Sequence, residues 1–266
     1  MDPTHSSQTG ESQVQVGEPH GARRGVECTV NAMTTICGVD GCSLGWIAVS
    51  KDLPSGRVSW SLHPGTDRLF TEKGTAQVIA IDIPIGLPER GPRLCDLEAR
   101  QLLGASRGTS VFPAPIRPVL SANSPDEASE IRNKVEGKKM SRPAFRVLAR
   151  ARQVDASLRE TPKLRAQVRE IHPEVSFFFL AGGRPMRESK KTEAGRSERE
   201  ELLKAAFGRS VSDALGVGYY LQTTADDVLD AFAALWTAER IFNGTSVTLP
   251  AAPLLDGTGL RMEIVA

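Results

Sequence analysis

Acidic residues at the ends of apolar runs are the first feature of the sequence that could do chemistry. Asp40 closes residues 36–40 (ICGVD), and Asp82 closes residues 77–82 (QVIAID). Aspartate is depleted within strands, so an aspartate at the end of such a run either caps a turn or serves a reaction. If the two runs form neighbouring parallel strands, a spacing of about 4.8 Å brings the two carboxylates together.

Two further aspartates lie near the start of a long helix expected over residues 224–243. At about 100° per residue, Asp227 and Asp230 share a helix face that is otherwise made of alanines, while the large apolar side chains lie opposite. A face of alanines can approach a sheet closely, which would keep both acids out of bulk water. Glu174, which follows His172 and Pro173, is another carboxylate beside a predicted strand.

Clustered carboxylates repel one another, and their pKa values rise unless cations neutralise them. Ligation by oxygen alone suits Mg²⁺ or Mn²⁺, and two such ions about 3.5 to 4 Å apart can activate water and stabilise the leaving oxygen in phosphodiester hydrolysis. We therefore predict a divalent-metal site formed by Asp40, Asp82, Asp227 and Asp230. Taken singly, each acid is more simply explained by a structural role, as a turn cap or as a charge that complements a helix dipole.

Short β-rich runs and turn residues indicate which elements must position these acids. Three strands in quick succession predict an antiparallel meander, and a short helix followed by a fourth, nearly continuous apolar strand completes a β-β-β-α-β order. Apolar patterns further along the chain predict strands over residues 168–172, 175–180 and 261–265. Capping residues mark the starts of the helices, and a capping box at Ser197 predicts a helix from there to Phe207. The expected early strands are residues 36–40, 45–50, 57–62 and 77–82, and the expected helices are residues 66–73, 94–103, 124–137, 141–159, 197–207 and 224–243.

The chain has 266 residues, of which 40% are hydrophobic and 24% charged, as is typical of globular proteins. Residues 1–35 contain no aromatic residue and predict a disordered tail, and Met33 is an alternative translation start. We expect one α/β domain over residues 36–266, with a basic helical insertion at about residues 84–165.

Composition also excludes several classes of protein. No apolar run approaches the roughly 18 residues that a membrane span needs, so a membrane protein is excluded. The four cysteines form no C-x-x-C pair and the four histidines lack ligand spacing, which argues against a zinc ribbon or a disulfide scaffold and for a cytoplasmic protein.

Positive charge is concentrated in one segment. Residues 90–170 hold 17 lysines and arginines against 9 aspartates and glutamates, a net charge of +8 in a chain whose net charge is +1. Such a segment either forms solvated helix faces or attracts phosphate on a nucleic acid or a nucleotide.

The order of strands and acids resembles the ribonuclease H-like superfamily, and residues 227–233 (DVLDAFA) resemble the helix motif of RuvC-type resolvases. Nearly all of residues 36–266 is similar to an uncharacterised family, domain of unknown function 429, whose members are described as predicted RNase H-like nucleases. Six segments carry this similarity in order: residues 38–46 (GVDGCSLGW), 81–88 (IDIPIGLP), 110–115 (SVFPAP), 172–177 (HPEVSF), 189–196 (SKKTEAGR) and 262–264 (MEI).

The resemblance implies a ribonuclease H-like mixed sheet, with an antiparallel meander followed by parallel strands, flanking helices and a helical insertion. It assigns Asp40 to the first-strand acid, Asp82 to the fourth-strand acid, and Asp227 with Asp230 to the helix pair, while Glu174 comes from the His-Pro-Glu segment alone. All five are therefore expected catalytic residues of a metal-dependent nuclease or phosphodiesterase.

Polar residues of the same segments are expected to bind the phosphate of a substrate. Two rival interpretations remain: a nucleotide-dependent phosphotransferase of the same superfamily, and a non-catalytic regulatory protein that binds nucleic acid or nucleotide. The expected substrate-binding residues are Arg107, Ser110, Lys190, Lys191 and Arg196.

Overall fold

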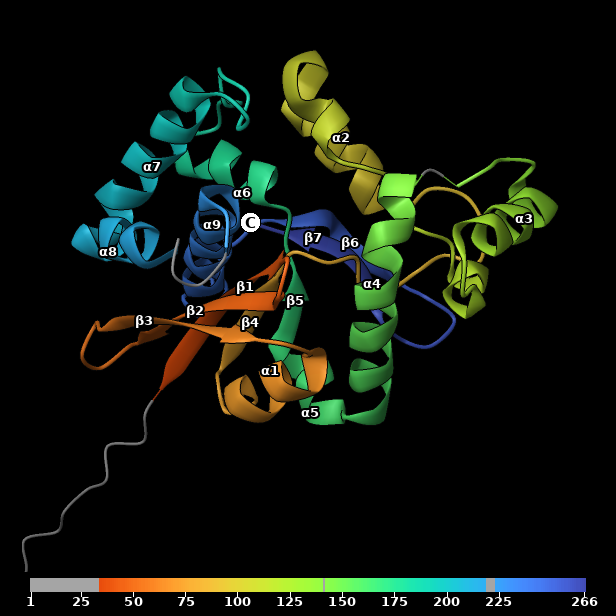
Figure 1. Cartoon of the computed structure of the whole chain (residues 1–266), viewed down its shortest axis with the longest axis horizontal. Helices are drawn as coiled ribbons and strands as arrows, with labels where there is room; N and C mark the ends of the chain where they lie inside the picture. The colour runs from red at the N-terminus through yellow and green to blue at the C-terminus, as the bar shows by residue number, and fades with distance from the viewer. Residues whose placement is uncertain (1–33, 141, 219–222) are drawn as a thin grey trace, which may run out of the picture. The chain divides into compact units, whose positions relative to one another are not determined.

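A five-stranded mixed sheet is the centre of the protein (Figure 1). A computed structural model describes residues 34–140, 142–218 and 223–266, which belong to one compact unit. The strands lie in the order β3-β2-β1-β4-β5, with β1, β2 and β3 antiparallel and with β4 and β5 parallel to β1. The strand bounds are Thr35–Cys42 (β1), Gly45–Asp52 (β2), Val58–His63 (β3), Val78–Ile81 (β4) and Val168–Glu170 (β5).

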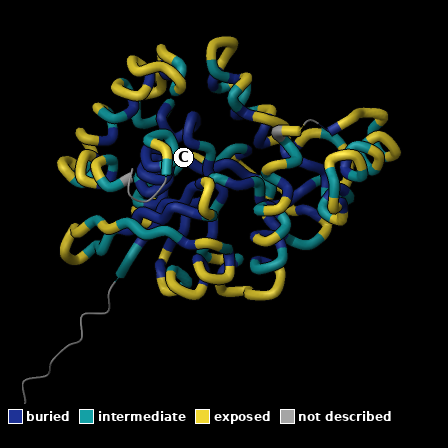
Figure 2. Tube along the Cα trace, viewed as in Figure 1, coloured by how far each residue is buried: buried dark blue, intermediate teal, exposed yellow. Residues whose placement is uncertain are grey.

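Both faces of the central strands are covered, as their nearly continuous apolar character predicts. Successive side chains of a strand point to opposite faces, so Ile36 of β1 packs in one apolar core whereas Cys37 and Val39 pack in the other. On this alternation Asp40 lies on the same face as Ile36. Figure 2 shows the buried residues concentrated in the sheet and in the long helix that covers this face.

The helix α9 (Ala225–Phe242) covers the face of the sheet to which Asp40 belongs. Its approach to β1 is so close that a Cβ built on Gly38 would lie 2.0 Å from the backbone nitrogen of Leu235 and 2.4 Å from the carbonyl oxygen of Ala231. The predicted close approach of the alanine face is therefore confirmed. On its other side α9 packs against α6 (Pro173–Leu180), α7 (Glu193–Phe207) and α8 (Arg209–Gly218).

The opposite face of the sheet packs against α1 (Thr66–Lys73), α4 (Arg142–Glu160) and α5 (Pro162–Gln167). The result is a layer of helices on each side of the sheet (Figure 1). A two-stranded sheet of β6 and β7 continues from the β5 side through a parallel bridge between Ile171 and Val265. The remaining elements are α2 (Leu94–Arg107), η1 (Gly108–Ser110), η2 (Arg117–Ser121), α3 (Pro125–Glu136), β6 (Thr248–Leu255) and β7 (Arg261–Val265).

The mixed sheet and most elements agree with the sequence-based predictions, but the strand predicted over residues 175–180 is wrong. These residues form α6, in which Pro173 occupies the first turn and Glu174 is its acidic residue. Both are helix-start signals, and they prevail over the strand preference of a run rich in valine and phenylalanine.

Two helix boundaries also differ from prediction. The helix predicted from Ser197 begins at Glu193, because the Thr192 hydroxyl accepts a hydrogen bond from the Gly195 backbone N–H (3.1 Å). The helix expected to stop at Gly104 continues to Arg107 across a kink at that glycine. Neither α8 nor β6 is anticipated by the sequence patterns.

Some predictions concern residues that the structure does not describe. These are the disordered tail apart from Thr34 and Thr35, the alternative translation start at Met33, the unpaired state of Cys28, and the start of a helix at Ser141. Cys37, Cys42 and Cys95 are buried free thiols. Within the described ranges, none of the helices has the length and apolar character required to cross a membrane.

Gly38→Ala tests the contact between β1 and α9. We expect the free energy of unfolding to fall by about 1 to 3 kcal/mol or more. The new methyl group would meet the backbone of α9, which cannot move without disrupting the helix. Urea unfolding measures the change. Gly216→Ala in α8 is the control, since a Cβ there meets open space and should leave stability unchanged or slightly raised. Equal stability of the parent and Gly38→Ala would contradict this packing of β1 against α9.

Candidate active site

Asp40 and Asp82 meet at one edge of the sheet because β1 and β4 are adjacent and parallel. The backbone N–H of Asp82 donates a hydrogen bond to the carbonyl oxygen of Val39 (3.0 Å), which continues the pairing beyond the end of β4. The two carboxyl groups are close enough for the charge of Asp82 to act on Asp40. Asp40 is buried and Asp82 is half-buried. The expected adjacency of the two strand ends is confirmed.

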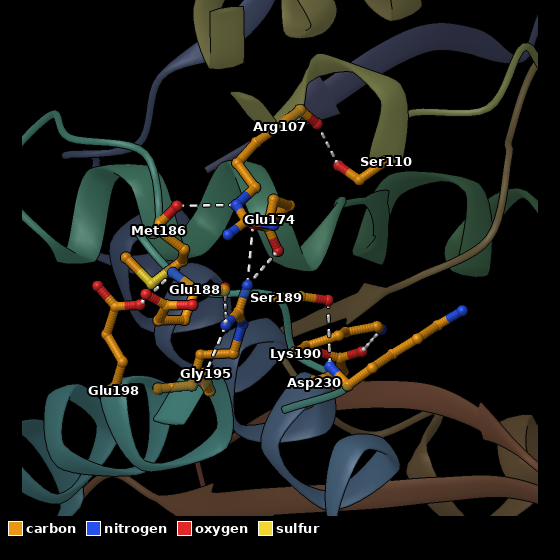
Figure 3. A network of polar contacts seen from close by, with 12 residues as sticks. Arg107, Ser110, Glu174, Met186, Glu188, Ser189, Lys190, Gly195, Glu198 and Asp230 are labelled. Carbon is orange, nitrogen blue, oxygen red and sulfur yellow. Dashed lines mark hydrogen bonds and ion pairs between the residues drawn. The ribbon is translucent and has the colours of Figure 1, made fainter. Parts of the chain in front are cut away.

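Asp230 joins these acids from α9 and holds a lysine beside them. The Lys190 ammonium donates a hydrogen bond to Asp230 Oδ2 at 2.7 Å, as Figure 3 shows. The carboxylate of Asp230 is buried, whereas Lys190 reaches it from the loop that precedes α7. One cation therefore faces the negative charges of several strand-end and helix carboxyl groups.

Burial raises the pKa values of all three acids, and repulsion by neighbouring acids of the site adds to the shift for Asp40 and Asp82. The pKa of Asp40 lies well above its ordinary value, first because the group is buried and then because Asp82 and Asp230 repel its charge. Burial, followed by repulsion from Asp230, raises the pKa of Asp82 to about 7. Burial also raises the pKa of Asp230, although Lys190 opposes that shift.

The pKa of Lys190 moves in the opposite sense. Burial alone would lower it, but attraction by Asp230 and then by Asp40 and Asp82 raises it above the ordinary value. The ammonium group therefore stays charged, and it is the counter-ion of the acids.

Asp227 lies in the first turn of α9, where its carboxylate takes part in the helix cap. Its carboxylate accepts a hydrogen bond from the Thr224 backbone N–H (2.9 Å), and the Thr224 hydroxyl accepts one from the Asp227 N–H (3.2 Å). This capping box begins α9. Among the described residues, no three histidine, cysteine, aspartate or glutamate side chains are grouped as ligands of a metal ion. Asp227 still contributes repulsion at Asp40.

Glu174 is paired with an arginine rather than with the aspartates. Both of its carboxylate oxygens accept hydrogen bonds from Arg199 (2.9 and 2.8 Å), and Arg107 lies 3.7 Å away. Arg199 is almost fully buried, and it also donates to the Gly195 carbonyl (2.8 Å) while lying over the Phe177 ring. The structure thus places Glu174 in an ion pair that joins α6 to α7.

A cavity of about 720 Å³ lies beside the acids. Asp82 and Glu174 supply its negative charges, and five cations line it, namely Arg107, Arg146, Lys190, Lys191 and Arg199. The proline-rich segment after η1 forms another part of the wall. The excess of cations makes this cavity suited to an anion.

Four of the five predicted substrate-binding residues line this cavity, namely Arg107, Ser110, Lys190 and Lys191. Arg107 is itself held by the carbonyl oxygens of Met186 (2.8 Å) and Arg187 (2.7 Å), as Figure 3 illustrates for Met186. Ser110 Oγ donates to the Arg107 carbonyl (2.7 Å). Arg196 is exposed on α7 and is absent from the cavity wall.

Sequence reasoning missed Arg199 and Arg146. A signal for Arg199 does exist: Glu174 adjoins an apolar run, and a buried carboxylate needs a cationic or hydrogen-bonding partner. The partner nevertheless lies 25 residues away on another helix. No local pattern distinguishes Arg146 from the other arginines of α4.

The basic segment, residues 90–170, does not form one free cationic surface. Arg93 is buried and donates to both oxygens of Glu170, at 2.7 and 2.6 Å, and to Asp96 at 2.6 Å. Arg169 pairs in the same way with Glu263. Several of the basic residues therefore stabilise the fold.

The residues matched by one family model include every predicted catalytic acid. Residues 38–254 match the model described as a protein of unknown function, DUF429. The chain belongs to the DUF429 family. The resemblance to this family is thereby confirmed. Searches of curated proteins and of solved structures find no significant match to this DUF429 chain.

Glu174→Ala separates a structural role from a catalytic one. We expect the free energy of unfolding to fall by about 3 to 5 kcal/mol, because Arg199 would be left buried without its carboxylate. Urea unfolding measures this loss, and Glu201→Ala on the exposed side of α7 is the control. Unchanged stability together with lost metal binding would instead identify Glu174 as a ligand.

The raised pKa of Asp82 predicts a pH dependence of stability in chelator-treated buffer. Its pKa of about 7 in the folded protein exceeds its ordinary value of 3.8, so the folded protein binds more protons between these values. The contribution of Asp82 to stability therefore falls as pH rises through this window. We expect the stability of Asp82→Asn relative to the parent to grow from about pH 4 to pH 7 and then level off.

Urea unfolding across this pH range provides the measurement. The control is Asp213→Asn, which removes a carboxylate exposed on α8, and its difference from the parent should not follow the same window. A difference for Asp82→Asn that is constant with pH would show that the group titrates normally.

Proposed function

We propose that this protein is a divalent-metal-dependent phosphodiesterase of the RNase H-like type, and most specifically a nuclease. The observation that carries the proposal is the convergence of Asp40, Asp82 and Asp230, from two strand ends and a helix. In this site Asp82 and Asp230 raise the pKa of Asp40, and Asp230 raises the pKa of Asp82. Proteins maintain such repulsion chiefly at functional sites, because it destabilises the fold unless a cation is bound.

The topology supports the same proposal. An antiparallel meander, a helix and a parallel fourth strand follow one another in the order that the resemblance implies, with acids on the first strand, after the fourth strand and on a late helix. The fold alone does not determine a reaction, so the proposal depends on the acids themselves.

The donor set fits a hard divalent cation such as Mg²⁺ or Mn²⁺. Three carboxylates face one ammonium group, so the site keeps an excess of negative charge when the acids are ionised. Asp40, Asp82 and Asp230 would hold the ion. Because they are not grouped as ligands in the described structure, their carboxylates would have to draw together while Lys190 moves from Asp230. A bound ion supplies a more acidic water and neutralises charge on a phosphate.

The cationic cavity lies where a phosphate ester would meet Asp82. Arg107 and Lys191 line it together with Asp82, so a phosphate held by the cations would be adjacent to the acidic site. A phosphotransferase of the same superfamily would require a nucleoside triphosphate for turnover, and a regulatory protein would bind its ligand without forming product. Product analysis therefore discriminates among the three.

Asp40→Asn tests the metal site. We expect calorimetric titration with Mn²⁺ to show binding to the parent and a loss of at least about tenfold in affinity for the variant, because one oxygen ligand and one charge are removed. Asp67→Asn on α1 is the matched control. Identical Mn²⁺ titrations of the parent and Asp40→Asn would reject the site.

The same preparation tests the reaction. Cleavage of phosphodiester substrates should require Mg²⁺ or Mn²⁺, stop on chelation, and be inhibited by Ca²⁺, whose larger and looser coordination fits two-ion geometry poorly. Activity that survives chelation would exclude the proposed mechanism.

A further inference from the structure

Phe112 is an exposed aromatic side chain in the wall of the cationic cavity. It is 71% exposed, although most phenylalanines of a folded protein are buried. Pro113 and Pro115 follow it closely and also line the cavity, and their rings fix the backbone φ angle. The aromatic ring is therefore presented by a stiff segment.

Hydrogen bonds hold this segment from several sides. Buried Asp96 accepts the backbone N–H of Ala114 at 3.0 Å, and Arg100 donates to the Val111 carbonyl at 2.7 Å. Asp96 is held in turn by the ion pair with Arg93. The exposure of Phe112 is thus a consequence of how the loop is anchored, since buried Val111 before it and buried Ala114 after it fix the course of the backbone.

Two cations of the cavity are available to a ligand. Lys191 lines it from the loop before α7 and Arg146 from α4, and both side chains are exposed. Within the described residues, neither of these two side chains makes an ion pair or a hydrogen bond. Lys190 and Arg199, in contrast, are bonded to Asp230 and Glu174.

We propose that this cavity binds a single unpaired nucleotide, with its base stacked on Phe112 and its phosphate held by Lys191 and Arg146 beside Asp82. The inference rests on the proposed function, because the nucleotide is the substrate of the same site. Aromatic side chains bind bases through stacking, which every base permits, and lysine and arginine bind phosphate.

The cavity volume favours this ligand over a duplex. About 720 Å³ falls within the roughly 300 to 1,000 Å³ of small-ligand sites. A base inside a duplex is stacked on both faces and offers none to Phe112. A free nucleoside monophosphate and the unpaired end of a strand share the required chemistry, and they are separate arms of the test.

The test is calorimetric binding in the presence of EDTA, with adenosine 5′-monophosphate, adenosine and inorganic phosphate as probes. We expect the monophosphate to bind more tightly than either fragment. Phe112→Ala should weaken its binding by about 5- to 150-fold, the range measured for loss of a base-stacking partner. Phe112→Trp should retain binding, and the control Phe242→Ala removes a ring that is 44% exposed at the end of α9.

A second arm tests the cations and the source of the nucleotide. Replacing both Lys191 and Arg146 with alanine should lower the affinity for the monophosphate at least about tenfold, whereas Lys163→Ala on α5 should leave the affinity unchanged. A short 5′-phosphorylated single strand should bind more tightly than a blunt duplex of the same sequence. If the strand binds and the monophosphate does not, the ligand is a strand end; the reverse result identifies a free nucleotide.

Several results would overturn the inference. These are inorganic phosphate binding as tightly as the tighter of the two nucleotide probes, equal effects of Phe112→Ala and Phe242→Ala on that probe, or, where the single strand binds, a duplex binding as tightly as the strand. Metal-dependent turnover without nucleotide binding in EDTA would reject this inference and leave the proposed function standing. Nucleotide binding without metal-dependent turnover would reject the proposed function alone.

Discussion

The close contact between β1 and α9 is the constraint on which the rest of the structure depends. Only a residue without a side chain fits at Gly38, where the backbone of α9 passes within van der Waals contact of the strand. Asp40 lies two residues further along the same face of β1, and Asp230 lies one residue before Ala231 on the helix. The small residues that permit the contact therefore also bring a strand acid beside a helix acid.

The acidic site is stable because its charges are partly neutralised and partly protonated. Lys190 supplies one fixed positive charge, and the pKa of about 7 lowers the ionisation of Asp82 at neutral pH. The loop that carries Lys190 is itself tightly shaped, since a Cβ on Gly195 would lie 1.9 Å from the carbonyl oxygen of Ser189. Lys190 thus reaches Asp230 from a backbone position that packing determines.

Local patterns predicted most of the sheet, because the alternation of side chains and the turn residues are local signals. The strand ends at Asp40 and Asp82 could be placed side by side from sequence, and so could the alanine face that carries Asp230. The helix at Glu174 was predicted as a strand because apolar β-formers outweighed the proline at its start. The partners Arg199 and Lys190 depend on tertiary packing, so spacing alone could not assign their carboxylates.

The charged residues of this protein fall into two groups. Buried ion pairs hold the walls of the site in place, and exposed cations of the cavity are free to bind a ligand. Buried pairs, such as Arg93 with Glu170 and Arg199 with Glu174, are satisfied by several hydrogen bonds and fix loops against helices. Breaking one such pair would leave a charge unpaired in the interior, so a ligand cannot recruit these arginines without a large penalty. The exposed cations of the cavity, Lys191 and Arg146, have no protein partner among the described residues to lose. They can therefore exchange bound water for phosphate with little loss of stability. An anion that enters the cavity therefore binds to a surface that the buried pairs have already positioned, beside carboxyl groups whose own repulsion favours a divalent ion.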